Sequence, residues 1–401
     1  MIKKTDIPLL ILGMVSTFAG LGLARFSYAP LIPEMVAQGW FSASDAAYLG
    51  AANLAGYLLG AVTAHWLASR FGSPLLIRLS LVGIFFSFVL LAHPGWFIWF
   101  GLWRFVAGMA GAYLMILAPS LVMAQADAER RSSLGVLVFM GIGLGIMMSA
   151  FVVPMLSNIS LGITWLVLGL GAALACLMGF INLNRIKCPD NNPSTEQASA
   201  LKSAEPIATI SVLLKVSLIL VIVAYGLDAV AYVPHSLFWV DFLASEGGLG
   251  VGIAGIQWFL FGLGACFGPW FAAWISQHVG PHKALIIALV IKSLGIALAL
   301  LPLHWLSNSL SSFLVGAMVP AVVGLTSATI AANFGLSRHQ ALWGLATTVF
   351  ALGQAASGYL MSWWFSMEDS YLRLFEVATL IMILALLLVI VSHLLSTRNP
   401  S

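Results

Sequence analysis

The sequence predicts an all-α membrane protein that crosses the bilayer twelve times, as two pseudo-symmetric bundles of six helices each. Hydrophobic residues make up 61% of the 401 positions, charged residues only 8%, and the mean hydropathy is +1.02. That is too little charge to cover the surface of a soluble protein. The apolar runs are long and unbroken, which indicates helices rather than the short alternating strands of a membrane barrel. One long polar stretch lies near the middle of the chain, and the sequences on its two sides resemble each other.

The individual spans follow from the lengths of the apolar runs, because a spanning helix needs about 20 mostly apolar residues. Short breaks with turn residues and charges separate twelve such runs. They cover approximately residues 7–37, 45–68, 75–92, 96–124, 133–157, 162–183, 213–242, 249–275, 284–302, 307–332, 342–366 and 371–395. The first run is too long for a signal peptide and carries Arg25, so it is expected to remain as the first spanning helix.

The distribution of basic residues predicts the orientation, because cytoplasmic loops of membrane proteins are enriched in Lys and Arg. With the N-terminus inside, the inner ends hold Lys3, Lys4, Arg70, Arg78, Arg130, Arg131, Arg185, Lys187, Lys202, Lys215, Lys283, Arg338 and Arg398. The outer ends hold one base and six acids: Arg373, Glu34, Asp45, Asp241, Glu246, Glu368 and Asp369. Both termini are therefore predicted to be cytoplasmic, in a protein integral to the bacterial inner (plasma) membrane.

The polar stretch of residues 185–211 divides the chain. It is rich in Pro, Asn, Ser and charged residues and cannot bury a core, so it is predicted to be a flexible cytoplasmic linker between bundles 1–184 and 212–401. A shift of 208 positions aligns the halves without a gap. The aligned pairs are Gly56/Gly264, Gly60/Gly268, Trp66/Trp274, Gly72/Gly280, Phe105/Phe313, Gly108/Gly316, Arg130/Arg338 and Gly145/Gly353. Parallel repeats of this kind can rock about a central site, which is the physical basis of alternating access.

Three segments carry a family resemblance. Residues 20–35 read G-L-G-L-A-R-F-S-Y-A-P-L-I-P-E-M, which resembles the hallmark of the YbfB/YjiJ-like branch of the major facilitator superfamily. Residues 104–112, R-F-V-A-G-M-A-G-A, resemble the R-x-x-Q-G-x-G-x-A element of its fourth helix. Residues 65–74, H-W-L-A-S-R-F-G-S-P, resemble its signature loop G-x-L-A-D-R-x-G-R-K, with Ser69 in place of the acid.

The resemblance implies a monomeric transporter whose helices 1, 4, 7 and 10 line a central cavity. It also implies a gating role for the loop that contains Arg70 and Gly72, with Gly280 as the counterpart in the second half. It does not name the transported molecule.

Two arginines lie inside predicted spans, where an ionised side chain costs about 2.5–3.5 kcal/mol on insertion scales. Arg25 is roughly 27 Å from the inner end of its helix and shares a face with Tyr28. The resemblance directs it into the cavity as a substrate contact; the alternative is that it binds a carbonyl group of a broken helix or a lipid headgroup. Arg104 is roughly 12 Å from the outer end of its helix. Charge recognition and an interhelical anchor both remain open for it.

The seventh span carries the most polar helical face. Tyr225, Asp228, Tyr232, His235 and Trp239 follow one another at i, i+3, i+7, i+10 and i+14, which places them on one side of a helix. A carboxylate at the depth of Asp228 is a candidate proton carrier; the alternative is a static pair of Asp228 with an arginine. Tyr232, His235 and Trp239 are predicted to line the substrate site, although aromatic stripes of this kind also occur as plain packing.

Further polar residues in the spans are predicted with less specific roles. Asn53, Tyr57 and Gln354 are expected substrate contacts, with interhelical hydrogen bonds as the alternative. Lys292 lies in the predicted peripheral ninth span, and its long side chain is expected to snorkel to the inner surface. The G-x-x-x-G pairs of the second and eighth spans, Gly56/Gly60 and Gly264/Gly268, predict close approach to neighbouring helices.

These features predict a secondary-active transporter of a small organic solute, coupled to protons through Asp228. Arg25 and Arg104 favour a substrate with a carboxylate. The sequence contains no nucleotide-binding G-x-x-x-x-G-K-[ST] loop, nucleophile–base pair or metal-ligand spacing, so no enzyme activity, cofactor, metal or nucleic-acid partner is expected. Two alternatives remain: an exporter of hydrophobic cations with Asp228 as the counter-charge, and a receptor that binds a ligand without transporting it.

Overall fold

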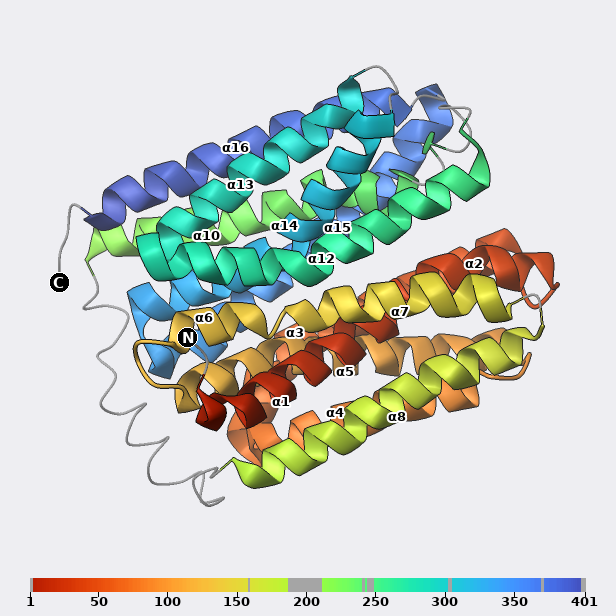
Figure 1. Cartoon of the computed structure of the whole chain (residues 1–401), viewed down its shortest axis with the longest axis horizontal. Coiled ribbons are helices and arrows are strands. Elements are labelled where there is room, and N and C mark those ends of the chain that lie inside the picture. The colour runs from red at the N-terminus through yellow and green to blue at the C-terminus, as the bar shows by residue number, and fades with distance from the viewer. Residues whose placement is uncertain are drawn as a thin grey trace. The chain divides into compact units, whose positions relative to one another are not determined.

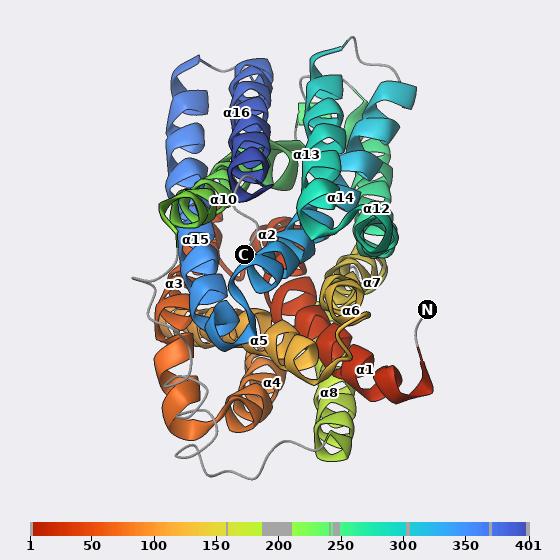
Figure 2. The ribbon, with the colours of Figure 1, turned by 90° about the vertical axis from the view of Figure 1, so that its left-hand side faces the viewer.

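The computed structural model describes residues 3–157, 159–186, 211–239, 242–243, 249–301, 305–368 and 371–397. Secondary structure in these ranges is helical, without strands. The chain divides into two compact units, Met1–Glu196 and Gln197–Ser401 (Figure 1, Figure 2). Most of the predicted linker, and Asp241, Glu246, Asp369, Lys187, Lys202 and Arg398 of the predicted loops and ends, lie outside the described residues, so the linker remains a prediction.

The N-terminal unit follows the predicted runs, with two of them subdivided. The first run forms α1 (Ile7–Thr17), a π-helix (Phe18–Phe26) and α2 (Tyr28–Ala37) in succession. The fifth run forms α6 (Arg131–Leu137) and α7 (Met140–Leu156). The others are α3 (Ala43–Phe71), α4 (Ser73–Leu90), α5 (Phe97–Gln125) and α8 (Leu161–Arg185).

The C-terminal unit has a comparable order. Its helices are α10 (Val212–Ala231), followed by a π-helix (Pro234–Phe238), α12 (Gly250–Val279), α13 (Pro281–Ala297), α14 (Trp305–Phe334), α15 (Leu336–Glu368) and α16 (Tyr371–Thr397). Helix pairs that pack together in one unit have counterparts in the other. α3 packs on α5 as α12 packs on α14, α4 on α8 as α13 on α16, and α1 on α8 as α10 on α16. The internal packing of the two units therefore supports the predicted repeat.

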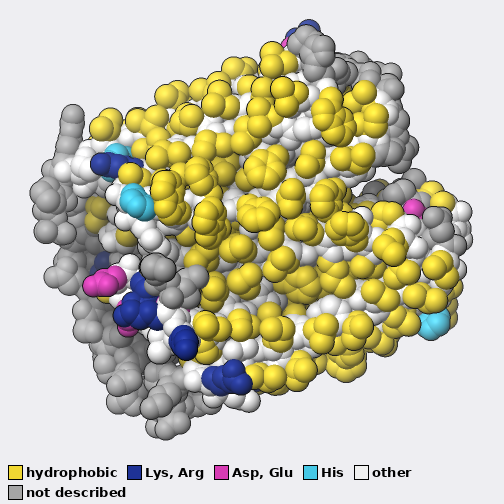
Figure 3. All heavy atoms as spheres, viewed as in Figure 1, with side chains coloured by type: hydrophobic (Ala, Val, Ile, Leu, Met, Phe, Trp, Pro, Cys, Tyr) yellow, Lys and Arg dark blue, Asp and Glu magenta, His cyan; other side chains and the backbone are white. Residues whose placement is uncertain are grey.

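The surface and helix lengths indicate a multi-pass membrane protein. Among the described residues, ten helical segments are long and apolar enough to cross a membrane; α3 and α15 are not among them. The count of twelve spans and the cytoplasmic location of the termini therefore remain predictions. Figure 3 shows hydrophobic side chains over most of the visible helix surface.

The predicted G-x-x-x-G pairs do bring helices into backbone contact. A Cβ atom added to Gly56 would overlap the carbonyl oxygen of Phe105 on α5, and one added to Gly264 would overlap that of Phe313 on α14. The second glycine of each pair, Gly60 or Gly268, also faces the backbone of α5 or α14, respectively. The close-approach prediction is confirmed in both units.

The predicted gating loop is a sharp turn between two helices. Gly72 ends α3 with φ of 84°, and Gly280 ends α12 with φ of 83°, a region that a side chain disfavours. The guanidinium of Arg70 is exposed and lies 5.9 Å from the centroid of the Phe71 ring. Ser69, which replaces the family's acid, donates a hydrogen bond to the carbonyl oxygen of Trp66. The gating role of this loop remains a prediction.

A buried ion pair joins the segment before α1 to the loop between α5 and α6 in the N-terminal unit. Nε of Arg130, between α5 and α6, donates to Oδ2 of Asp6 at 2.8 Å, and its Nη2 donates to Oδ1 of Asp6 at 3.2 Å. Both side chains are at most 9% exposed. The same Nη2 lies 2.5 Å from Oδ2 of Asp127, whose side chain is 65% exposed. The chain before α1 is thereby attached to the loop that follows α5.

Breaking this attachment is expected to loosen the start of α1. Asp6→Asn should lower the unfolding free energy by about 1–3 kcal/mol, because it removes a charged acceptor from a largely buried guanidinium. Asp127→Asn is the matched control on the same arginine, and its exposed carboxylate should contribute under about 1 kcal/mol. Thermal unfolding of the purified variants measures the difference. Equal losses in the two variants would contradict the assignment of Asp6 as the principal partner.

Candidate functional site

Arg104 in the N-terminal unit is anchored inside the bundle. Its side chain on α5 is buried, and its Nη1 donates a hydrogen bond of 2.8 Å to the carbonyl oxygen of Ala24. Its Cζ lies 3.8 Å from the centroid of the Tyr28 ring, a close cation–π contact. These contacts favour the anchor over charge recognition, because the guanidinium already binds the first spanning segment. Nε of Arg104 has no hydrogen-bond partner among the described residues.

The carbonyl oxygen of Ala24 is the point where three helices meet. It lies in the π-helix Phe18–Phe26, a widened turn of the kind found often at functional sites. Besides Arg104, it accepts a hydrogen bond of 3.4 Å from Nδ2 of Asn53 on α3. The same amide donates to the carbonyl oxygen of Arg104 at 3.0 Å. The hydroxyl of Tyr28 donates to the carbonyl oxygen of Ala46 at 2.9 Å. Asn53 is thus bound to backbone groups, the interhelical alternative considered for it, and the hydroxyl of Tyr28, which the sequence pattern placed beside Arg25 as a substrate contact, is also bound to the backbone.

Arg25 differs from Arg104 in making no hydrogen bond to the backbone of the described residues. Its side chain is partly exposed, and its Cζ lies 5.7 Å from the ring centroids of both Phe26 and Tyr57. No hydrogen bond or ion pair joins its guanidinium to the residues that the structure describes. A guanidinium without a counter-charge in a spanning segment is costly and is a candidate binding group for an anion.

The C-terminal unit contains a fully buried ion pair. Nζ of Lys292 on α13 lies 2.5 Å from Oδ1 of Asp228 on α10, and the two side chains are 0% and 1% exposed. The expectation that Lys292 snorkels to the surface is therefore wrong, because its ammonium group is paired in the interior. The static partner considered for Asp228 was an arginine, and the partner is a lysine. The second carboxylate oxygen, Oδ2, has no hydrogen-bond partner among the described residues.

Two further predicted site residues surround this pair. The ring centroid of Tyr232 lies 4.9 Å from Nζ of Lys292, so the aromatic face stabilises the ammonium group. The hydroxyl of Tyr232 is hydrogen-bonded to the side-chain amide of Gln354 on α15. Oε1 of Gln354 is buried and, like Oδ2 of Asp228, lacks a partner within the described part of the chain. The structure therefore brings Asp228, Tyr232 and Gln354 together around Lys292.

His235 and Trp239 belong to a separate hydrogen-bonded network with α14. The Oγ of Ser311 donates to the carbonyl oxygen of Gly295 at 2.7 Å, which uses its only proton. Nε2 of His235, 2.9 Å from that Oγ, must then be the donor and carries a proton. Nδ1 is buried without a hydrogen-bond partner among the described residues.

Trp239 continues the network toward α12. Its ring stacks on His235 with 4.7 Å between centroids, and its Nε1 donates to Oγ of Ser312 at 2.8 Å. Ser312 in turn donates to Oε1 of Gln257 at 3.0 Å. Both aromatic side chains are fully buried. These contacts fit a packing role for His235 and Trp239; a substrate contact remains a prediction for them.

The polar face predicted for the seventh span (Tyr225, Asp228, Tyr232, His235 and Trp239) thus separates into three environments. Tyr225 packs on Phe350 and Trp343, Asp228 and Tyr232 surround Lys292, and His235 and Trp239 bind the serines of α14. Sequence reasoning missed Ser311, Ser312 and Gln257 and misread Lys292. Lys292 had a usable signal, since it is a charge in the middle of an apolar run. The two serines had no such signal, because Ser is common in spanning helices.

No group of three His, Cys, Asp or Glu side chains suited to a metal ion occurs within the described ranges.

Comparisons with known proteins agree with this architecture. Among curated proteins, none matches the sequence. A double-tryptophan mutant of XylE has a TM-score of 0.75 at 15% identity, covering 98% of this chain and 99% of that one. The major facilitator proton:xylose symporter XylE bound to 6-bromo-6-deoxy-D-glucose has a TM-score of 0.72 at 16% identity, covering 95% and 94%. The two likenesses establish the fold.

A family model adds the sequence relationship that the structural likenesses do not carry. It matches residues 17–390, which include both units and every candidate residue discussed above. Its description is an uncharacterised transporter of the major facilitator type, YbfB. The chain belongs to this YbfB family of major facilitator transporters.

Proposed function

We propose that this transporter is secondary-active and carries a small organic solute with a carboxylate group, together with a proton that Asp228 accepts. The observation that carries the proposal is the Asp228–Lys292 pair, which is completely buried and leaves one carboxylate oxygen without a hydrogen-bond partner among the described residues. In this proposal the protein works as a monomer by alternating access. It lies in the bacterial inner membrane with both termini in the cytoplasm, as the Lys and Arg distribution predicts.

Charge balance explains how such a pair couples a proton to an anion. A proton on Oδ2 of Asp228 neutralises the carboxylate and leaves Lys292 charged in a low-dielectric interior. An uncompensated buried charge is strongly unfavourable. An anionic group of the solute restores the balance, so protonation of Asp228 and binding of the solute favour each other. Release of either one then favours release of the other, which is the requirement for cotransport.

Arg25, in the N-terminal unit, is a separate candidate contact for a carboxylate. It is a guanidinium without a counter-charge among the described residues, and its Cζ lies 5.7 Å from the ring centroids of Phe26 and Tyr57. Guanidinium groups bind carboxylates through two parallel hydrogen bonds. XylE, which shares the fold, is described as a proton:xylose symporter, so proton coupling occurs on this architecture.

The exporter alternative is less well supported by these contacts. A hydrophobic cation needs an unpaired acid as its counter-charge, and Lys292 already neutralises Asp228. The receptor alternative predicts ligand binding without flux.

Proteoliposomes that contain a pH-sensitive dye distinguish cotransport, export and a receptor. A pH gradient is imposed, and pools of carboxylates, amino acids, sugars and lipophilic cations are added in turn. Proton uptake that depends on a carboxylate or amino-acid pool supports the proposal; proton movement only with cations supports export; binding without flux supports a receptor.

Arg25→Gln is expected to weaken solute binding by about tenfold to a hundredfold, because a charge-assisted hydrogen bond contributes about 1.5–3 kcal/mol. Arg25→Lys should retain part of the affinity, since it keeps the charge but loses the bidentate geometry. The half-saturating concentration of the solute found in the pools measures both variants. Arg373→Gln is the control, because Arg373 is an exposed arginine paired with Glu376. Unchanged affinity in Arg25→Gln would remove Arg25 from the binding site.

A further inference from the structure

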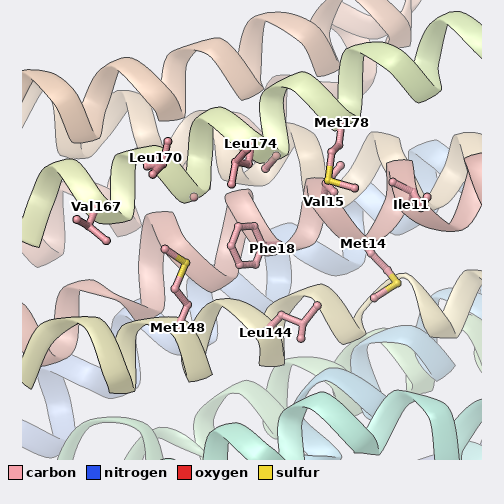
Figure 4. Close-up of a pocket in the computed structure, with 12 residues that line it drawn as sticks. Ile11, Met14, Val15, Phe18, Leu144, Met148, Val167, Leu170, Leu174 and Met178 are labelled. Carbon is pink, nitrogen blue, oxygen red and sulfur yellow. The ribbon is translucent and has the colours of Figure 1, made fainter. Parts of the chain in front are cut away.

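An apolar cavity opens on the side of the N-terminal unit, away from the polar clusters described above. Its volume is about 420 Å³, and it lies where α1, the start of the following π-helix, α7 and α8 meet. The lining side chains are all hydrophobic, and Gly171 completes the wall. Figure 4 shows Leu174 and Met178 of α8 on one side, Leu144 and Met148 of α7 on the other, and the Phe18 ring between them.

The cavity is open to the outer surface of the unit. Several lining residues are also part of the outer surface: Leu170 is 59% exposed, Leu174 54% and Met178 42%. In a membrane-spanning unit such side chains contact lipid tails. A hydrocarbon chain fits this lining, since an empty apolar cavity forfeits the dispersion contacts of its walls and does not attract water.

The charges beyond the cavity indicate what kind of lipid carries that chain. α1 and α8 pack against each other, and the start of α1 and the end of α8 lie at the same end of the unit (Figure 1, Figure 2). Lys4 precedes the lining residue Ile11 by seven positions, and Arg185 follows Met178 by seven, a helical rise of roughly 10 Å in each case. Both basic side chains are exposed. The neighbouring acid, Asp6, is buried and bound by Arg130.

We propose that this cavity is a binding site for an anionic phospholipid, with one acyl chain inside and the phosphate near Lys4 and Arg185. Beyond the cavity, α1 and α8 each carry an exposed basic side chain that forms no ion pair with the residues that the structure describes. The surface attraction of an anionic headgroup amounts to about fivefold in affinity for each basic side chain. Bound lipid would support Phe18, and with it the π-helix that carries Ala24 and Arg25.

Photo-crosslinking and native mass spectrometry of the full chain test the two parts of the site. The probes are phosphatidylglycerol and phosphatidylcholine with the same diazirine-labelled acyl chain. The wild type is expected to retain phosphatidylglycerol at least fivefold better than phosphatidylcholine and to be labelled on the peptide that contains Met178. The variant Lys4→Gln/Arg185→Gln alters only exposed side chains and should lose the preference while keeping the acyl-chain label. Equal retention of both lipids by the wild type would overturn the headgroup part.

Filling the cavity tests the acyl-chain part. A Cβ atom on Gly171 would lie 2.7 Å from the flexible end of Met148, so Gly171→Leu projects into the cavity without meeting backbone. In the Gly171→Leu variant, photo-labelling of the peptide that contains Met178 should fall severalfold. Ala173→Leu, a half-buried position on the same helix that does not line the cavity, should label like the wild type. Undiminished labelling in folded Gly171→Leu would show that bulk lipid reaches this surface without a defined site. The readout is independent of transport, so failure of the proposed function leaves it unaffected.

Discussion

Asp228→Asn alone is expected to lower the unfolding free energy by about 3–5 kcal/mol, the usual cost of removing one partner of a buried ion pair. Lys292 is 0% exposed and would keep an ammonium group in the interior without a counter-charge. Thermal unfolding of the purified variant in detergent measures the loss. The exposed pair of Arg373 and Glu376 in the same unit provides the control, because Glu376→Gln should change the unfolding free energy by less than about 1 kcal/mol.

The double variant Asp228→Asn/Lys292→Met separates a structural role of the pair from a coupling role. Removing both charges ends the buried imbalance, and replacing a buried ion pair by apolar groups is often neutral or stabilising. The double variant should therefore regain most of the stability that Asp228→Asn loses. It should nevertheless fail to accumulate solute in response to a pH gradient, since no group remains to take the proton.

The outcomes of that comparison are mutually exclusive. Restored stability with lost proton-driven accumulation supports coupling through Asp228. Restored stability with accumulation equal to the wild type would show that the pair only holds α10 against α13. The single variant Asp228→Glu keeps an acid beside Lys292 and should retain measurable coupling.

Gly264→Leu is expected to prevent α12 from packing on α14. Any side chain at Gly264 would overlap the carbonyl oxygen of Phe313, and a backbone atom cannot move aside as a side chain can. Overpacking of flexible side chains already costs about 1–3 kcal/mol, and a backbone overlap should exceed that range. Size-exclusion chromatography of the solubilised protein should show little or no monodisperse material.

A second glycine on the same helix makes this test specific. A Cβ atom at Gly255 would have nothing within 4 Å, so Gly255→Leu changes the composition of α12 equally without touching α14. It should give a normal chromatographic profile and unfolding temperature. A normal profile for Gly264→Leu would contradict the close crossing. A collapsed profile for Gly255→Leu would mean that α12 tolerates no leucine, whatever its contacts.

Hydropathy and spacing were sufficient for the features that depend on one helix at a time. The membrane class follows from composition, because lipid accepts only chains that satisfy their own backbone groups. The glycine pairs follow from a four-residue spacing, which places both members on one face and leaves room for another backbone. Arg25 and Asp228 could be selected because each is a charge far from either end of an apolar run.

Residue partners depend on which helix faces meet. Asp228 and Lys292 are separated by 64 positions, and their contact requires α10 and α13 to present these residues to each other at the same depth. The ninth span was expected to be peripheral, so its lysine was assigned to the surface. Arg104 and Arg25 have similar sequence signals, yet only Arg104 finds a backbone oxygen, because the π-helix at Ala24 offers one to α5.

By itself, the sequence determined that this chain is a helical membrane protein, which family it resembles, where its helices approach closely, and that Arg25, Arg104 and Asp228 are charges within apolar runs. These properties are set by local composition and periodicity, which every helix expresses alone. Only the tertiary structure decided which charges are compensated. In that structure Asp228 pairs with Lys292, Arg104 donates to the carbonyl oxygen of Ala24, and the guanidinium of Arg25 has no hydrogen bond or ion pair among the described residues. Compensation of a charge depends on distances of a few ångströms between different helices, and no single-helix pattern contains that information.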